Sequence, residues 1–283
     1  MSYGTIKYYI EVLKPRASIL LTFIGVCTAI IAGDGQLSLK LLLIALTVFL
    51  AAAGANGLTN YLDCGIDARM LRTRNRALPS RCINPPEKVL PINISLLVIG
   101  LGLAWFLHPL CFISGVIGTM AALIGRKRVT CVFPQGMVAS CAPVLGGWFA
   151  VDPTFSWELV LLCVLIAIWL PMHVWSVMIA NREDYIGAGL TYFPVSWKVA
   201  EAVKVLLVFG LVLAAAAITL YFIGSFGLVY LVVVSLLSIV IIWASARLVI
   251  SGTSRNAWWL YKLSAFPYLG LIFLVMCLDI WLT

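Results

Sequence analysis

Charged side chains are scarce in this sequence, and their scarcity excludes a water-soluble fold. Only 11% of the residues are Asp, Glu, Lys or Arg, while 63% are hydrophobic; a soluble domain carries roughly 25% charged residues. With a mean hydropathy of +1.08, the chain lacks the polar side chains that a water-facing surface needs. A lipid bilayer is the solvent that suits it.

Paired cysteines are also lacking. The eight cysteines stand singly, with no CxxC pair, and most lie in apolar runs, where Cys behaves as a small hydrophobe. We therefore expect neither disulfides nor a zinc site. Residues 1–16 are polar and no short apolar core with a small-residue cleavage site follows them, so no cleavable signal peptide is expected.

Long apolar runs are what the sequence has instead. A helix needs about 20 residues to cross a bilayer, and runs of that order predict nine membrane-spanning helices. No linker or low-complexity segment divides the chain, so residues 1–283 are expected to form one all-α domain. The runs lie near 17–34, 40–62, 89–107, 109–125, 134–151, 158–180, 202–222, 226–248 and 263–282.

The basic residues orient these helices. If the N-terminus lies in the cytoplasm, every Lys and Arg except Lys40 falls in a cytoplasmic segment, as the positive-inside rule requires. This asymmetry predicts an odd number of spans in the cell (inner) membrane, with an external C-terminus. It also accounts for the net charge of +8, so we expect no nucleic-acid partner.

Polar residues gather where the second run ends. Asn56, Asn60, Asp63 and Asp67 are spaced to share one helix face if the helix continues. Two carboxylates one turn apart repel each other at a membrane edge unless a cation lies between them. Carboxylate and amide oxygens suit Mg²⁺, which readily shares its coordination with a substrate phosphate.

Arginines follow this acidic face. Segment 69–80 carries four arginines, and Arg binds phosphate oxygens in bidentate fashion. Topology alone would explain the arginines but not the acids before them, so the pair of motifs predicts a magnesium–diphosphate site. For the basic cluster at Lys127 and Arg128, topology alone and a diphosphate role stay equally open.

A second polar constellation ends the sixth run. Pro171 predicts a loosened helix next to His173, and Asp184 lies 11 residues beyond His173. On a continuous helix the two would face the same way, roughly 16 Å apart. A histidine inside the membrane above an acidic cluster favours function over a packed interior role. Aromatic rings that could stabilise an allyl cation, or simply anchor the interface, are Tyr61, Trp169, Trp175 and Tyr185.

Together these motifs resemble the UbiA superfamily of membrane prenyltransferases, and most closely its heme o synthase (protoheme IX farnesyltransferase) branch. The likeness runs nearly end to end. Its motifs are Leu13-Lys14-Pro15-Arg16, Asn60-x-x-Asp63-x-x-x-Asp67, Arg72-Thr73-x-x-Arg76, Lys127-Arg128-x-Thr130, Pro143 to Trp148, Trp169-x-Pro171-x-His173, Arg182-x-Asp184-Tyr185, and Ser264, Tyr268 and Asp279 near the end.

The resemblance implies a helical bundle around a central cavity open to the cytoplasmic side. It implies Mg²⁺-dependent transfer of a farnesyl group from farnesyl diphosphate to a vinyl group of heme b, with heme a synthase or oxidase assembly proteins as candidate partners. Asp63, Asp67, Asp184 and Asn60 would hold magnesium, and His173 would contact the porphyrin. The substrate-binding residues would be Arg72, Arg76, Lys127, Arg128, Arg182 and Tyr185.

Other functions stay open at this point. A related prenyltransferase for another acceptor, such as a quinone precursor, would share the diphosphate site. A transporter could use the Gly and Pro breaks within its spans, although acids and bases gathered at one edge argue against it. A heme-binding cytochrome would need two histidines at similar depth, whereas His108 is expected near the external face and His173 toward the cytoplasm.

Overall fold

The computed structural model describes residues 3–124, 133–224 and 226–282, and helices are the only regular elements in these segments. The first half contains α1 (Tyr3–Val12), α2 (Pro15–Ala32), α3 (Lys40–Asp67), η1 (Pro86–Val89), α4 (Leu90–Leu107), α5 (Pro109–Leu123) and α6 (Gln135–Phe149). The second contains α7 (Trp157–Ala180), α8 (Arg182–Gly187), α9 (Val199–Ile223), α10 (Leu228–Ser251), α11 (Ser254–Leu263), η2 (Ser264–Gly270) and α12 (Leu271–Leu282).

The expected membrane helices are present. Within the described residues, seven helical stretches are long and apolar enough to cross a bilayer. The two remaining predicted runs correspond to α5 and α6, which have 15 residues each. The chain is thus an all-helical, multi-pass membrane protein, and the count of nine spans stays a prediction. The seven stretches are Pro15–Ala32, Lys40–Asp67, Pro86–Leu107, Trp157–Ala180, Val199–Ile223, Leu228–Ser251 and Ser254–Leu282.

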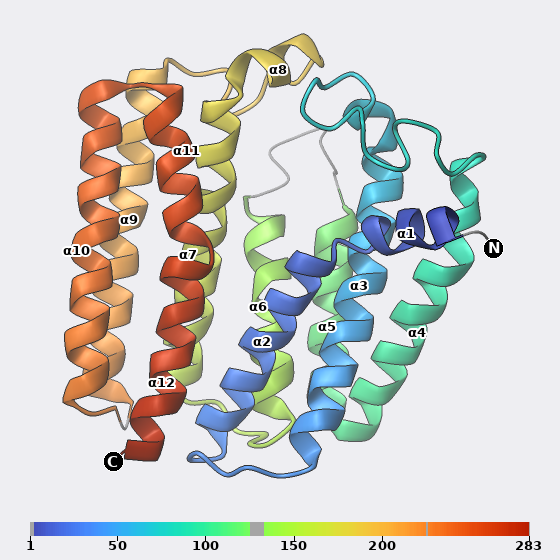
Figure 1. Cartoon of the computed structure of the whole chain (residues 1–283). Helices are drawn as coiled ribbons and strands as arrows, with labels where there is room; N and C mark the ends of the chain where they lie inside the picture. The colour runs from blue at the N-terminus through green and yellow to red at the C-terminus, as the bar shows by residue number, and fades with distance from the viewer. Residues whose placement is uncertain (1–2, 125–132, 225, 283) are drawn as a thin grey trace.

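The helices form two groups that share one core. In Figure 1, α2 to α6 stand on one side and α7, α9, α10 and α11–α12 on the other. Helix α2 packs against α3, α6 and α12, while α7 packs against α6, α9 and α11, so both groups contact each other directly. Ile24, Leu165 and Phe273, drawn from three different spans, are fully buried between them.

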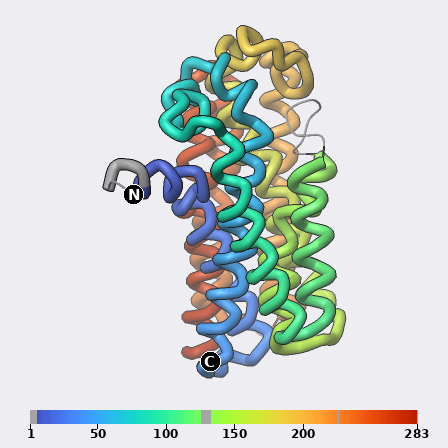
Figure 2. The backbone as a smooth tube through the Cα atoms, turned by 90° about the vertical axis from the view of Figure 1, so that its right-hand side faces the viewer, coloured from blue at the N-terminus to red at the C-terminus, as the bar shows by residue number. Residues whose placement is uncertain are grey.

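One end of the bundle, which we call the polar end, carries the longer connections. Figure 1 shows α8 and the connection after α3 at the same end, with the C-terminus at the other. In the side view of Figure 2, α1 projects sideways from the bundle near that polar end. A small separate core formed by Val12, Ala77, Leu78, Ile83 and Val89 ties α1 and η1 to residues 68–80, which we call the arginine segment.

The structure confirms the expected continuous helix of α3 and overturns the expected continuation of α7. Helix α3 runs to Asp67, so Asn60, Asp63 and Asp67 do lie on one continuous helix. Helix α7 crosses Pro171 without interruption but ends at Ala180, and Asp184 belongs to the separate helix α8. The expectation that His173 and Asp184 share one helix face is therefore wrong.

The break after Ala180 has a local cause. The side-chain amide of Asn181 donates to the carbonyl of Val177 at 2.7 Å, and Asn181 leaves helical geometry with φ −119° and ψ 32°. Asn side chains that bond to nearby backbone compete with the helical hydrogen bonds. The chain then turns across the end of the bundle as α8 (Figure 1).

Candidate active site

The acidic face of α3 lies at the polar end of the bundle. Asp63 and Asp67 are each only 2% exposed. The amide nitrogen of Asn60 donates to the carbonyl of Val12 at 2.6 Å, and its Oδ1 is buried without a hydrogen-bond partner. This orphaned oxygen beside two carboxylates is a donor set that fits Mg²⁺. In the described segments no three His, Cys, Asp or Glu side chains cluster as metal ligands.

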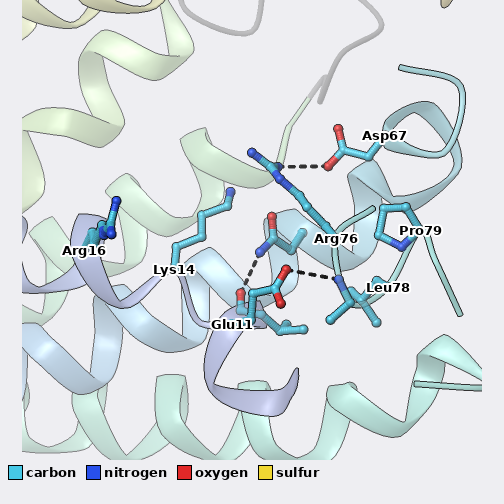
Figure 3. Close-up of a pocket in the computed structure, with 10 residues that line it drawn as sticks. Glu11, Lys14, Arg16, Asp67, Arg76, Leu78 and Pro79 are labelled. Carbon is cyan, nitrogen blue, oxygen red and sulfur yellow. Dashed lines mark hydrogen bonds and ion pairs between the residues drawn. The ribbon is translucent and has the colours of Figure 1, made fainter. Parts of the chain in front are cut away.

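A cavity of about 380 Å³ adjoins this face. In Figure 3, Lys14 and Arg76 extend toward the same space from opposite sides, and Asp67 pairs with Arg76 at 3.1 Å. Cationic groups held around one cavity repel each other, and a bound anion relieves that repulsion. The charged and amide residues that line it are Glu11, Lys14, Arg16, Asn60, Asp67 and Arg76.

Hydrogen bonds from α8 and α1 hold the arginine segment in place. The carboxylate of Asp184 accepts from the backbone N–H groups of Leu71 at 2.6 Å and Arg72 at 3.1 Å. Glu11 accepts from the backbone N–H of Ala77 at 3.1 Å. Asp184 thus contacts the start of the segment that follows Asp67, while its convergence on one metal with Asp63 and Asp67 stays a prediction.

Arg72 and Tyr185 are brought together. The Arg72 guanidinium donates to the Tyr185 hydroxyl at 3.3 Å. Burial raises the pKa of Tyr185, and the positive charge of Arg72 opposes part of that rise, so Tyr185 stays a neutral phenol at pH 7. Arg182 instead donates through Nε to the carbonyl of Val195 at 3.0 Å. Lys127 and Arg128 lie outside the described residues.

His173 occupies an aromatic sandwich between α7 and α11. Its ring stacks on Trp169, with centroids 4.9 Å apart, and on Tyr261, 4.3 Å apart. Its Nδ1 lies 2.9 Å from the hydroxyl of Ser264. Trp175 packs elsewhere, against Phe193 and Phe209. The aromatic residues singled out in the sequence therefore belong to separate clusters.

Three residues that sequence reasoning did not assign to the site line the cavity. Glu11, Lys14 and Arg16 come from the N-terminal segment, and Lys14 donates to Thr59 Oγ1 at 3.2 Å. The available signal was the polar motif Leu13–Arg16, which formed part of the family resemblance. Because this motif precedes Asn60 by more than 40 residues, nothing in the sequence indicated that the two lie at the same site.

A helical membrane bundle with an acidic helix face and an arginine segment beside a cavity has the layout of a membrane prenyltransferase. The sequence model of the UbiA prenyltransferase family matches residues 18–270. The chain therefore belongs to the UbiA prenyltransferase family and is a prenyltransferase enzyme.

Similar proteins carry a more specific name. A protoheme IX farnesyltransferase of Desulforudis audaxviator is 35% identical over 98% of this chain and 90% of its own length. Protoheme IX farnesyltransferase 1 of Picrophilus torridus is 32% identical over 98% of this chain and 95% of its own.

Solved structures support the fold. A digeranylgeranylglyceryl phosphate synthase matches with a TM-score of 0.78 at 19% identity, covering 98% of both chains. An Archaeoglobus fulgidus UbiA homologue bound to DMAPP and Mg²⁺ matches with a TM-score of 0.72 at 14% identity, covering 97% of this chain and 98% of its own. At such identities these likenesses show the fold alone.

Proposed function

We propose that this protein transfers the farnesyl group of farnesyl diphosphate to a vinyl group of heme b in a magnesium-dependent reaction that yields heme o. The observation that carries the proposal is the cavity in which Lys14, Arg16 and Arg76 meet the acidic face of α3. The choice of heme b as the acceptor rests on the similar proteins, which are named protoheme IX farnesyltransferases.

The cavity suits a leaving diphosphate. Negative charge accumulates on this group as its bond to the farnesyl carbon breaks, and cations fixed in advance around it lower the barrier. Arg76 is oriented by Asp67, and Lys14 by Thr59, so neither has to reorganise during the reaction. Bound magnesium would supply further charge neutralisation, held by Asn60, Asp63 and Asp67 on α3.

Asp184 is proposed as the third carboxylate of this site. It already contacts the backbone of Leu71 and Arg72, only a few residues after Asp67. Arg182, Tyr185, Lys127 and Arg128 are proposed to complete the binding of diphosphate or of the heme propionates.

The acceptor is proposed to lie against His173. As the diphosphate leaves, the π electrons of the vinyl group form the new carbon–carbon bond, and water quenches the resulting cation with loss of a proton. A chamber walled by apolar helices admits the farnesyl chain and keeps water from the allyl cation until then. The aromatic sandwich of Trp169 and Tyr261 holds the His173 ring plane in a fixed orientation.

The membrane arrangement is part of the same proposal. We place the N-terminus and the cavity opening on the cytoplasmic side of the cell membrane and the C-terminus outside, with α5 and α6 completing nine crossings. Support comes from the position of the arginine segment and α8 at the end opposite the C-terminus (Figure 1).

The test is turnover by the purified protein in lipid nanodiscs, supplied with heme b, farnesyl diphosphate and Mg²⁺. Heme o should form, detected by its mass and retention time, and chelation of magnesium should stop it. A parallel reaction supplies an aromatic quinone precursor in place of heme b. If that reaction gives a prenylated product and the reaction with heme b gives none, the acceptor in this proposal is wrong. Binding of both substrates without any transfer would overturn it.

A further inference from the structure

Ser264 stands where the last span changes its helical form. It is the first residue of the π-helical turn η2 and is fully buried. The next residue, Ala265, departs from helical geometry with φ −69° and ψ −137°, and π-helical turns inside helices are often found at functional sites. The carbonyl and the hydroxyl of Ser264 both contact α7: the carbonyl accepts from the Trp169 indole, and the hydroxyl lies 2.9 Å from His173 Nδ1.

The hydrogen bonds of Ser264 determine where the His173 proton lies. A serine hydroxyl has one hydrogen to donate. Tyr261 is in the last turn of α11, where carbonyls lack partners within the helix, and the Ser264 hydroxyl donates to the Tyr261 carbonyl at 3.0 Å. Toward His173 the hydroxyl must then accept, so Nδ1 carries the proton.

His173 Nε2 is left with its lone pair. In the described part of the chain the imidazole has two polar neighbours, the Ser264 hydroxyl at Nδ1 and the backbone carbonyl of Tyr261, and the residue is half-buried. Because a carbonyl can only accept, it offers the lone pair of Nε2 no donor. A neutral imidazole whose other nitrogen is held by a hydrogen bond is a good ligand or acceptor. The two stacked rings fix its plane, and Ser264 fixes its rotation within that plane.

We propose that Ser264 is a positioning residue that holds His173 protonated on Nδ1, so that Nε2 presents its lone pair to the porphyrin acceptor. The part of this statement that concerns the acceptor rests on the proposed function. The part that concerns the proton does not, and it can be tested on its own.

The position of the proton can be read by nitrogen NMR. The chain contains only two histidines, so protein labelled with ¹⁵N-histidine shows two imidazoles. His108 is an internal reference, because its Nδ1 accepts from the backbone N–H of Leu110 at 3.2 Å and its proton belongs on Nε2. We expect opposite tautomers, assigned with His108→Gln. A proton on Nε2 of His173 would overturn the inference.

Variants test whether Ser264 causes this arrangement. Ser264→Ala should lose the preference for Nδ1–H, whereas Ser264→Thr keeps the hydroxyl and should retain it. The matched control is Ser176→Ala, because Ser176 is also fully buried, lies on α7, and donates its hydroxyl hydrogen to the carbonyl of Met172 at 2.6 Å. An unchanged tautomer in Ser264→Ala would show that Ser264 does not set it.

Heme binding and turnover then test the consequence. Loss of a residue that orients a ligand typically costs about tenfold or more in affinity or activity, so Ser264→Ala should weaken heme b binding by about that factor and leave the Kd for a farnesyl diphosphate analogue unchanged. In a His173→Ala background it should cost nothing more, since it acts through His173. Wild-type protein that neither binds nor farnesylates heme would refute the proposed function instead; active wild type with an unaffected Ser264→Ala variant would refute the positioning role.

Discussion

The crossing of α2 and α6 leaves no room for a side chain at Gly147. A Cβ placed there would lie 2.0 Å from the carbonyl oxygen of Gly25 and 2.9 Å from its carbonyl carbon. Small residues at such crossings let the backbones of membrane helices approach closely. Gly147→Ala therefore forces the two helices apart, because backbone atoms cannot rotate out of the way as a side-chain end can.

The size of the effect follows from that overlap. Ordinary contact begins near 3.4 Å, so the distance of 2.0 Å must grow by 1.4 Å. Overpacking of this kind costs about 1–3 kcal/mol, and alanine returns up to about 1 kcal/mol through its higher helix propensity. We expect a net loss of about 1–2 kcal/mol and a lower apparent Tm.

The adjacent glycine is the matched control. A Cβ at Gly146 meets nothing within 4 Å, so Gly146→Ala should be neutral or stabilising by about 0.5–1 kcal/mol. Thermal unfolding in one detergent, followed by reaction of a fluorogenic dye with the buried cysteines, compares both variants with wild type. Equal Tm values for the two variants would refute the close approach of α2 and α6.

Other variants address the site, the fold and the topology. Asp63→Asn and Asp67→Asn should each lower turnover about a hundredfold or more; full activity in both would remove the acidic face from the mechanism. Asp279 is 1% exposed and accepts from the backbone N–H groups of Gly227 and Tyr230 at the start of α10. Asp279→Ala should lower the free energy of unfolding by about 1–3 kcal/mol because it leaves these donors unpaired, and Asp279→Asn should lower it less. Equal stability of the wild type and both variants would contradict this. Cysteines introduced at the two termini should react with impermeant reagents from opposite sides of sealed vesicles, and labelling from one side would exclude an odd number of spans.

The sequence by itself determined the features that depend on local physics. A bilayer requires each span to satisfy its own backbone hydrogen bonds, so apolar run length alone located the helices. The carboxylates and amides of α3 could be placed on one face because helical spacing is fixed by geometry. The resemblance to the UbiA superfamily depended on these same local motifs, and the family assignment confirmed it.

Only the tertiary structure decided which distant residues meet. Lys14 contacts Thr59 across 45 positions, Asp184 contacts Leu71 across 113, and His173 contacts Ser264 across 91. No periodicity encodes such contacts, because they depend on how the helices pack and on where the chain breaks. The break at Asn181 moved Asp184 off the axis of α7 and against the arginine segment, and the π-helical turn brought Ser264 to His173.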